Sequence, residues 1–179
     1  IPVIREQNMT QTLNAIELGL FSSRIEAVCD EMGAQLQQGL VLLIDYGYSG
    51  AEYYHPERDG GTLICHFRHR AYDDPYLLPG LHDITANVDF TAVATAAVDA
   101  GFELAGFTTQ AHFLIDTGLD RRLAASDPND VQAHMQLMQG VKQLTLPSEM
   151  GERFKVMALA LDTQVSLSGF TTRDLRDRL

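Results

Sequence analysis

The stretch from Val41 to Gly50, VLLIDYGYSG, decides the fold of this chain. Four consecutive apolar residues, an acid and two glycines are typical of a strand that is buried on both faces and ends in a tight turn. In open α/β sheets, ligands bind just beyond the carboxyl ends of such strands. The pattern therefore predicts that Asp45, Tyr46 and Tyr48 lie at a functional edge. Asp45 also has a structural interpretation, in which its carboxylate caps the turn.

The composition indicates one globular domain covering residues 1–179, long enough to bury a core. The formal net charge is -11, from 24 acidic and 13 basic residues. A field of that sign repels nucleic acid and suits a protein partner with a basic segment. No apolar run approaches the roughly 18 residues that a membrane span requires.

Cys29 and Cys65 are the two cysteines, and neither belongs to a C-x-x-C pair. This spacing excludes a zinc ribbon and favours reduced thiols in an intracellular protein. The chain opens with Ile1-Pro2-Val3, without a methionine and without the basic and apolar regions of a signal peptide. Such an opening suggests a truncated chain.

Helices and strands are expected on both sides of the organising stretch. A capping box at Ser23, an apolar stripe and Gly39 at C′ predict a helix leading into the strand at 40–45. Asp89 is expected to cap a helix that continues to about residue 100. Further predictions are a strand at 102–107, a short helix at 109–117, a helix starting at 127–128, a final strand at 154–161 and a frayed helix at 171–179. Val131, Met135 and Met138, on the helix that starts at 127–128, are expected to fill the core.

Residues 50–88 are expected to form an insertion on the substrate side of the domain. They show much turn chemistry and no helical pattern, with one short alternating strand at 63–67. Their aromatic residues argue against disorder, so a functional lid is the better interpretation.

Two familiar kinds of site are weighed and set aside. Gly47-Tyr48-Ser49-Gly50-Ala51 is one residue away from the G-x-S-x-G elbow of serine hydrolases, but no helix is predicted to follow it. His66 and His69, with acids nearby, could suggest a metal site. Positions i and i+3 of a strand point to opposite faces, so no metal is expected there.

A third group, at residues 83–90, combines two carboxylates with a hydroxyl before a helix. Asp89 has a structural role as the N-cap of that helix. Asp83 and Thr85 have no such role, which makes them candidates for a site.

Several ordered blocks of the sequence resemble the MidA-like family of methyltransferases. The blocks are LLIDYGYSG, GGTLICHFRHR, DPYLLPGLHDITANVDF, TTQAHFLIDTGL and EMGERFKVMAL. Members of this family are similar to mitochondrial complex I assembly factors that methylate a protein arginine with S-adenosylmethionine. The resemblance implies the C-terminal half of a class I, Rossmann-like α/β sheet that ends in an antiparallel hairpin.

The resemblance also implies roles for individual residues. Asp45, Tyr46 and Tyr48 would bind the substrate beside the methyl-transfer pocket, together with Thr85. The same blocks imply three catalytic residues, namely His69, Asp83 and Asp89. The cofactor would be S-adenosylmethionine, and no metal is implied.

The family's glycine-rich cofactor loop has no counterpart here, because no G-x-G-x-x-G occurs in the 179 residues. The cofactor is therefore expected to bind mainly to a part of the enzyme outside this chain. The expected compartment is the cytoplasm of a bacterium or the mitochondrial matrix of a eukaryote.

Two further expectations concern association. The strand at 40–45 would lose its neighbouring fourth strand, leaving an unpaired apolar edge. Residues 1–20, or a second copy in a homodimer, are expected to cover that edge. The alternative function is a non-catalytic acidic domain that binds a basic protein partner.

Overall fold

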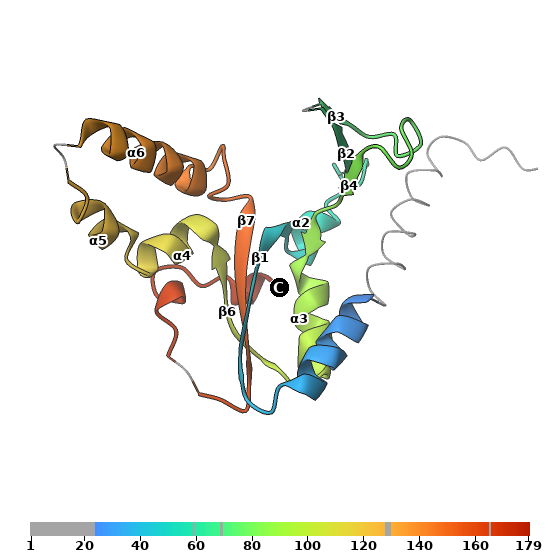
Figure 1. Ribbon diagram of the computed structural model, residues 1–179. Coiled ribbons are helices and arrows are strands. Elements are labelled where there is room, and N and C mark those ends of the chain that lie inside the picture. The colour runs from blue at the N-terminus through green and yellow to red at the C-terminus, as the bar shows by residue number, and fades with distance from the viewer. Residues whose placement is uncertain (1–23, 59, 69, 128–129, 165) are drawn as a thin grey trace, which may run out of the picture.

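The computed structural model describes residues 24–58, 60–68, 70–127, 130–164 and 166–179. Its main feature is a sheet with the strand order β5-β1-β7-β6 (Figure 1). The strands are β1 (Gly39–Tyr48), β5 (Val88–Asp89), β6 (Glu103–Thr109) and β7 (Phe154–Leu161). β7 lies between β1 and β6 and is antiparallel to both. This order confirms the predicted final hairpin of a class I sheet.

Helices cover the two faces of this sheet unequally. A helix at residues 24–35 and α3 (Phe90–Asp99) pack on one face, around Phe90, Phe107 and Met157. α4 (Gln110–Asp116) and the 3₁₀ turn η1 (Ser168–Phe170) cover the other face, around Val156 and Phe170. Apolar residues alternate between the two cores along β7, as the period of two in a strand requires.

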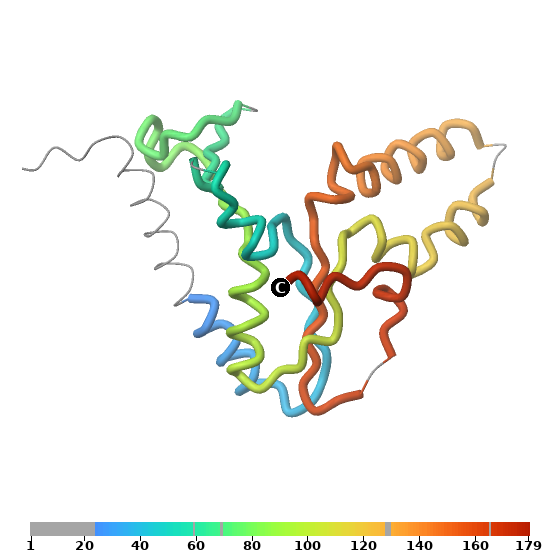
Figure 2. Tube along the Cα trace, turned by 180° about the vertical axis from the view of Figure 1, so that it is seen from behind, coloured from blue at the N-terminus to red at the C-terminus, as the bar shows by residue number. Residues whose placement is uncertain are grey.

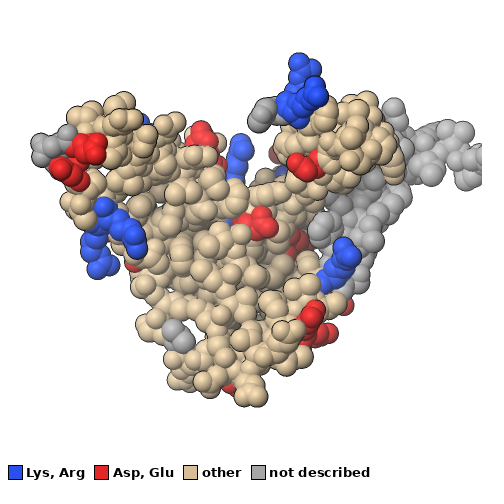
Figure 3. Space-filling view, viewed as in Figure 1, with Lys and Arg blue, Asp and Glu red and all other residues tan. Residues whose placement is uncertain are grey.

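Two projections rise beyond the carboxyl end of β1. One is an arm formed by α4, α5 (Leu119–Ala124) and α6 (Val131–Thr145). The other is a small sheet with the order β3-β2-β4, whose strands are Arg70–Tyr72, Ile64–Phe67 and Asp83–Thr85. Figure 3 shows a notch between the two projections, with acidic and basic side chains near its floor.

The expectation that the organising strand is buried on both faces is wrong. Val41 and Leu43 pack into the core beside α3. Leu40, Leu42 and Ile44 point to the opposite face and are 40%, 42% and 50% exposed. The reason is that α4 and η1 reach β6 and β7 but do not extend over β1.

The outer edge of β1 is open along most of its length in the described part of the chain. β5 pairs with β1 at Gly47 and Tyr48, whereas β7 pairs with it from Gly39 to Tyr46. The segment expected to cover this edge, residues 1–20, lies outside the described residues, as does Ser23. Coverage of the edge by that segment or by a second copy therefore stays a prediction.

Gly47 permits the contact between β1 and β5. A Cβ atom at this position would lie 2.2 Å from the carbonyl oxygen of Val88 and 2.8 Å from the ring of Phe90. The close approach of β5 and Phe90 to the end of β1 thus depends on the missing side chain.

The structure differs from the expected helices at three places. α2 (Gly50–Tyr53) follows β1 directly, although no helix was expected at 50–88. α6 is capped by Asp130, whose side chain accepts from the backbone of Ala133, and not at 127–128. Gly39 is the first residue of β1 and not a helix C′ residue, since the preceding helix ends at residue 35.

The apolar residues of α6 do not fill the core. Val131 and Met135 are 64% and 67% exposed. The helical period was predicted correctly, but α6 belongs to the projecting arm. An amphipathic pattern cannot show whether a surface is available to cover it.

The C-terminal tail is anchored, so its prediction as a frayed helix is wrong. The backbone N–H groups of Thr171 and Thr172 donate to Asp116 Oδ2 at 2.8 and 3.0 Å. The N–H of Leu175 then donates to the carbonyl of Phe107 at 2.6 Å, and the Leu175 side chain is buried. The tail ends in the turn η2 (Arg176–Arg178), and Figure 2 shows it crossing the molecule from the α4 side.

Replacing Asp116 by Ala should destabilise the fold by about 1–2 kcal/mol at pH 7, because two backbone donors lose a charged acceptor. Burial raises the pKa of Asp116. The hydrogen bonds from Thr172 and Thr171 together lower it by more than burial raises it, so the pKa lies below its usual 3.8. A depressed folded-state pKa gives stability that is present above the unfolded-state value and lost as the pH falls through the folded-state value. Urea unfolding at several pH values should therefore show the wild-type advantage shrinking below about pH 4. A difference that stays constant down to pH 3 would contradict this.

Candidate functional site

A polar cluster lies where the three long strands meet at the carboxyl end of β1. Its centre is Lys155 on β7, which pairs in register with Asp45 on β1 and Thr109 on β6. Lys155 is only 9% exposed. Its Nζ donates a hydrogen bond to the carbonyl oxygen of Glu152 at 2.5 Å. Burying an ammonium group costs free energy unless polar or charged groups surround it, so Lys155 requires such neighbours.

The pKa of Lys155 reflects these surroundings. Burial lowers it, the carboxylates of Glu52 and Glu152 raise it, and Arg173 lowers it again. The net result is a pKa below the ordinary lysine value. Two acids and two bases from three separate segments therefore influence one another at this point.

The carboxylate of Glu152 is held from two further directions. Arg173 Nη1 donates to Glu152 Oε1 at 3.2 Å. His112 Nδ1 lies 3.9 Å from the same oxygen and 2.9 Å from Thr109 Oγ1. α4 and the C-terminal tail thus converge on the loop that precedes β7.

Three of the predicted site residues lie at the end of β1, as expected. Asp45 is exposed, and its Oδ1 accepts from the backbone N–H of Tyr46 at 2.8 Å, within β1 and not in the turn that follows it. The ring of Tyr46 packs edge-on against Phe154, with centroids 5.6 Å apart. The guanidinium of Arg58 lies 4.1 Å from the centre of the Tyr48 ring.

The other predicted residues are more scattered. Asp89 caps α3, with Oδ1 accepting from the N–H groups of Thr91 and Ala92. Asp83 and Thr85 lie on β4 of the small sheet, where Thr85 Oγ1 donates to the carbonyl of Ile64. His69 lies outside the described residues. The structure therefore brings Asp45 and Asp89 to one hollow, while Asp83 and Thr85 belong to the projection beside the notch.

That hollow has a volume of about 420 Å³ and lies along the open edge of β1. Its walls come from the helix at 24–35, β1 and the start of α3, and they are largely apolar. The polar residues of its lining are Arg24, Asp45, Tyr53, Tyr54, Asn87 and Asp89.

The residues around Lys155 were missed as site residues in the sequence. One signal could have found them, namely a lone lysine in the apolar strand FKVMALAL. A charged residue that is inward-facing in a buried strand requires charged or polar neighbours. Glu52, His112, Glu152 and Arg173 could not be assigned to it from spacing, because they lie on four different segments.

The serine-hydrolase elbow and the metal site were the two kinds of site not expected from the sequence. The short helix α2 does follow Ser49, so the strand-turn-helix context is present after all. Ser49 is however only 4% exposed, and its hydroxyl is not displayed as a nucleophile elbow requires. Among the described residues, no group of histidines, cysteines and acids is arranged to hold a metal ion. The same part of the chain contains no helix of the length and apolarity needed to cross a bilayer.

A family model described as "putative S-adenosyl-L-methionine-dependent methyltransferase" matches residues 9–108. This match covers more than half of the chain, and the chain belongs to that family.

Solved structures and curated relatives agree with this assignment. A crystal structure of an uncharacterized protein from Burkholderia thailandensis is 42% identical, with a TM-score of 0.82 over 88% of this chain and 41% of that one. A second structure from the same organism, bound to S-adenosyl-homocysteine, is 42% identical with a TM-score of 0.81, over 88% of this chain and 40% of that one.

The curated relatives are named as mitochondrial protein arginine methyltransferases. NDUFAF7 of Danio rerio is 31% identical over 77% of this chain and 33% of its own length. NDUFAF7 of Bos taurus is 32% identical over 74% of this chain and 30% of its own length. The chain thus spans about a third of the curated relatives that it matches.

That S-adenosylmethionine binds mainly outside this chain stays a prediction. The sequence has no glycine-rich loop that would let a backbone approach the cofactor, and the hollow beside β1 is mostly apolar. What this chain does offer is the polar end of β1 and the charged cluster around Lys155.

Proposed function

We propose that this chain forms the acceptor side of an S-adenosylmethionine-dependent methyltransferase that modifies an arginine of a protein substrate. The observation that carries the proposal is the class I strand order β1-β7-β6, with charged residues gathered at the carboxyl end of β1. In α/β sheets this end of the strands is where ligands bind. The compartment would be the bacterial cytoplasm or the mitochondrial matrix, according to the source.

The shape of the molecule supports a protein as the acceptor. The notch in Figure 3 opens between the α4–α6 arm and the small sheet. Both projections carry exposed apolar side chains, among them Met135 on α6 and Tyr76 beside the small sheet. A large partner could contact both projections while one side chain enters the notch. The chain's net charge of -11 suits a basic partner segment.

The chemistry asked of this part is to orient a nitrogen atom for methylation. A guanidinium group presents several N–H donors in one plane, which carboxylates can hold at fixed angles. Carboxylates near the acceptor also stabilise its positive charge. The cluster around Lys155 supplies Glu52 and Glu152, and the small sheet supplies Asp83.

Methyl transfer from radiolabelled S-adenosylmethionine tests the proposal directly. The full-length protein is incubated with an extract of cells that lack it, and the labelled residue is identified by mass spectrometry. Label on an arginine is expected. Label on another residue would contradict the substrate assignment, and a protein that binds cofactor without transferring label would favour the non-catalytic alternative.

In the same assay, Asp83→Asn should lower methyl transfer at least about tenfold, the scale of a lost charged contact to the acceptor. Asp83 is exposed on β4, so the fold and the cofactor affinity should be unchanged. Asp73→Asn, an acidic residue in the loop after β3, is the matched control. Unchanged turnover in Asp83→Asn would leave that residue with a structural role.

A further inference from the structure

Hydrogen bonds from three elements hold the backbone of the loop that precedes β7. Three consecutive backbone carbonyls, those of Gly151, Glu152 and Arg153, each accept a hydrogen bond from a different element. Their donors are the N–H of Ala111 at the start of α4, Nζ of Lys155, and the N–H of Gly47 at the end of β1. The backbone of Glu152 is therefore held on both sides and at its own carbonyl.

The Glu152 side chain is also oriented. Oε1 accepts from Arg173 at 3.2 Å, and His112 Nδ1 is 3.9 Å away. In the described part of the chain, Oε2 has no hydrogen-bond partner. The Glu152 side chain as a whole is 38% exposed.

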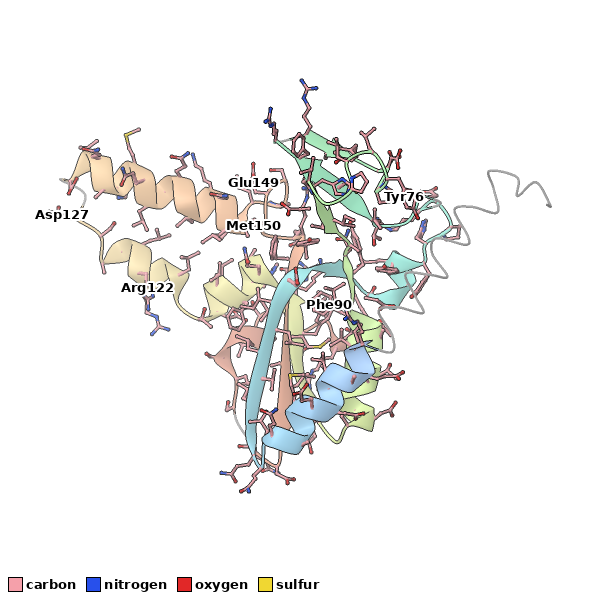
Figure 4. The ribbon with its side chains drawn as sticks, turned by 45° about the vertical axis from the view of Figure 1, so that its right-hand side comes forward. Tyr76, Phe90, Arg122, Asp127, Glu149 and Met150 are labelled. Carbon is pink, nitrogen blue, oxygen red and sulfur yellow. The ribbon has the colours of Figure 1, made fainter. Side chains whose placement is uncertain are left out.

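The position of Glu152 follows from the strand directions. Because β7 is antiparallel to β1 and β6, the residues just before β7 lie beside the carboxyl ends of both neighbours. Figure 4 labels the adjoining Glu149 and Met150 in this loop, and Tyr76 in the loop of the small-sheet projection. Of the three acids expected from the sequence, Asp89 already caps α3, and Asp45 and Asp83 are exposed on β1 and β4.

We infer that Glu152 is an acceptor-binding residue, whose carboxylate holds the guanidinium group of the substrate at the carboxyl end of β1. Lys155 and Arg173 are positioning residues that fix the backbone and one carboxylate oxygen, leaving Oε2 for the acceptor. Exposed ion pairs contribute little to stability, so the Arg173–Glu152 pair by itself does not account for the fixed backbone of this loop. This inference rests on the proposed function and names the residue that would recognise its substrate.

The test uses the full-length protein loaded with S-adenosylhomocysteine and the probe agmatine, a small guanidinium compound. Agmatine affinity is measured by nuclear magnetic resonance titration for wild type and Glu152→Gln. The substitution keeps the shape of the side chain and removes its charge, so affinity should fall at least about tenfold, as for a lost charged hydrogen bond. The affinity for S-adenosylhomocysteine should not change.

Two further variants separate recognition from tail anchoring. Asp174→Asn removes the neighbouring ion pair, in which Asp174 Oδ2 lies 2.7 Å from Arg176 Nε. This variant should leave agmatine binding unchanged. Arg173→Lys keeps a cation beside Glu152 and should retain most of the affinity. Agmatine affinity that is equal in wild type and Glu152→Gln would overturn the inference, and so would a wild-type protein that binds no agmatine. Failure to bind S-adenosylhomocysteine at the outset would instead refute the proposed function.

Discussion

Replacing Phe90 by Ala should lower the free energy of unfolding by about 3–5 kcal/mol, the usual cost of removing a large aromatic side chain from a core. Phe90 is 1% exposed, and its ring centre lies 5.2 Å from that of Phe107. It also fills the space above Gly47, so it joins β1, β6 and α3. Urea denaturation followed by circular dichroism measures the change.

Tyr76→Ala is the matched control, since it also removes an aromatic ring. Tyr76 is 80% exposed in the loop between β3 and β4. Figure 4 labels both Tyr76 and Phe90. Its replacement should change the unfolding free energy by no more than about 0.5 kcal/mol. Similar losses in the two variants would mean that the core around Phe90 is not packed as described.

The second large effect concerns the cofactor. The 179-residue chain alone should bind S-adenosylmethionine at least about 100-fold more weakly than the full-length protein, a difference of roughly 2.7 kcal/mol. The reason is that this chain has no glycine-rich loop to approach the cofactor. Isothermal titration calorimetry on both forms measures the ratio.

The shorter chain must be shown to be folded for this comparison to count. Its circular dichroism spectrum and a cooperative urea transition serve as the control. Micromolar affinity in the folded 179-residue chain would show that the acceptor half binds the cofactor unaided. In that case the hollow along β1, with Asp45 and Asp89 at its polar positions, becomes the place to look for the contacts.

The sequence determined the local elements for which the signal is short-range. The apolar run ending at Asp45 predicted β1, the side chain of Asp89 predicted the start of α3, and two apolar stretches predicted β6 and β7. Each depends on neighbours within a few residues. The ordered motifs further identified the family, and with it the antiparallel end of the sheet.

Tertiary structure alone decided which apolar faces are covered and which charges meet. Leu42 in β1 and Met135 in α6 have the patterns of buried residues, yet both are exposed because no described element packs over them. Periodicity reveals a face but not its partner. Likewise Glu152 looked like one acid among 24, until strand direction and two long-range backbone hydrogen bonds placed its loop at the end of β1. Contacts between residues far apart in the chain depend on how the strands pair, and no local spacing encodes that.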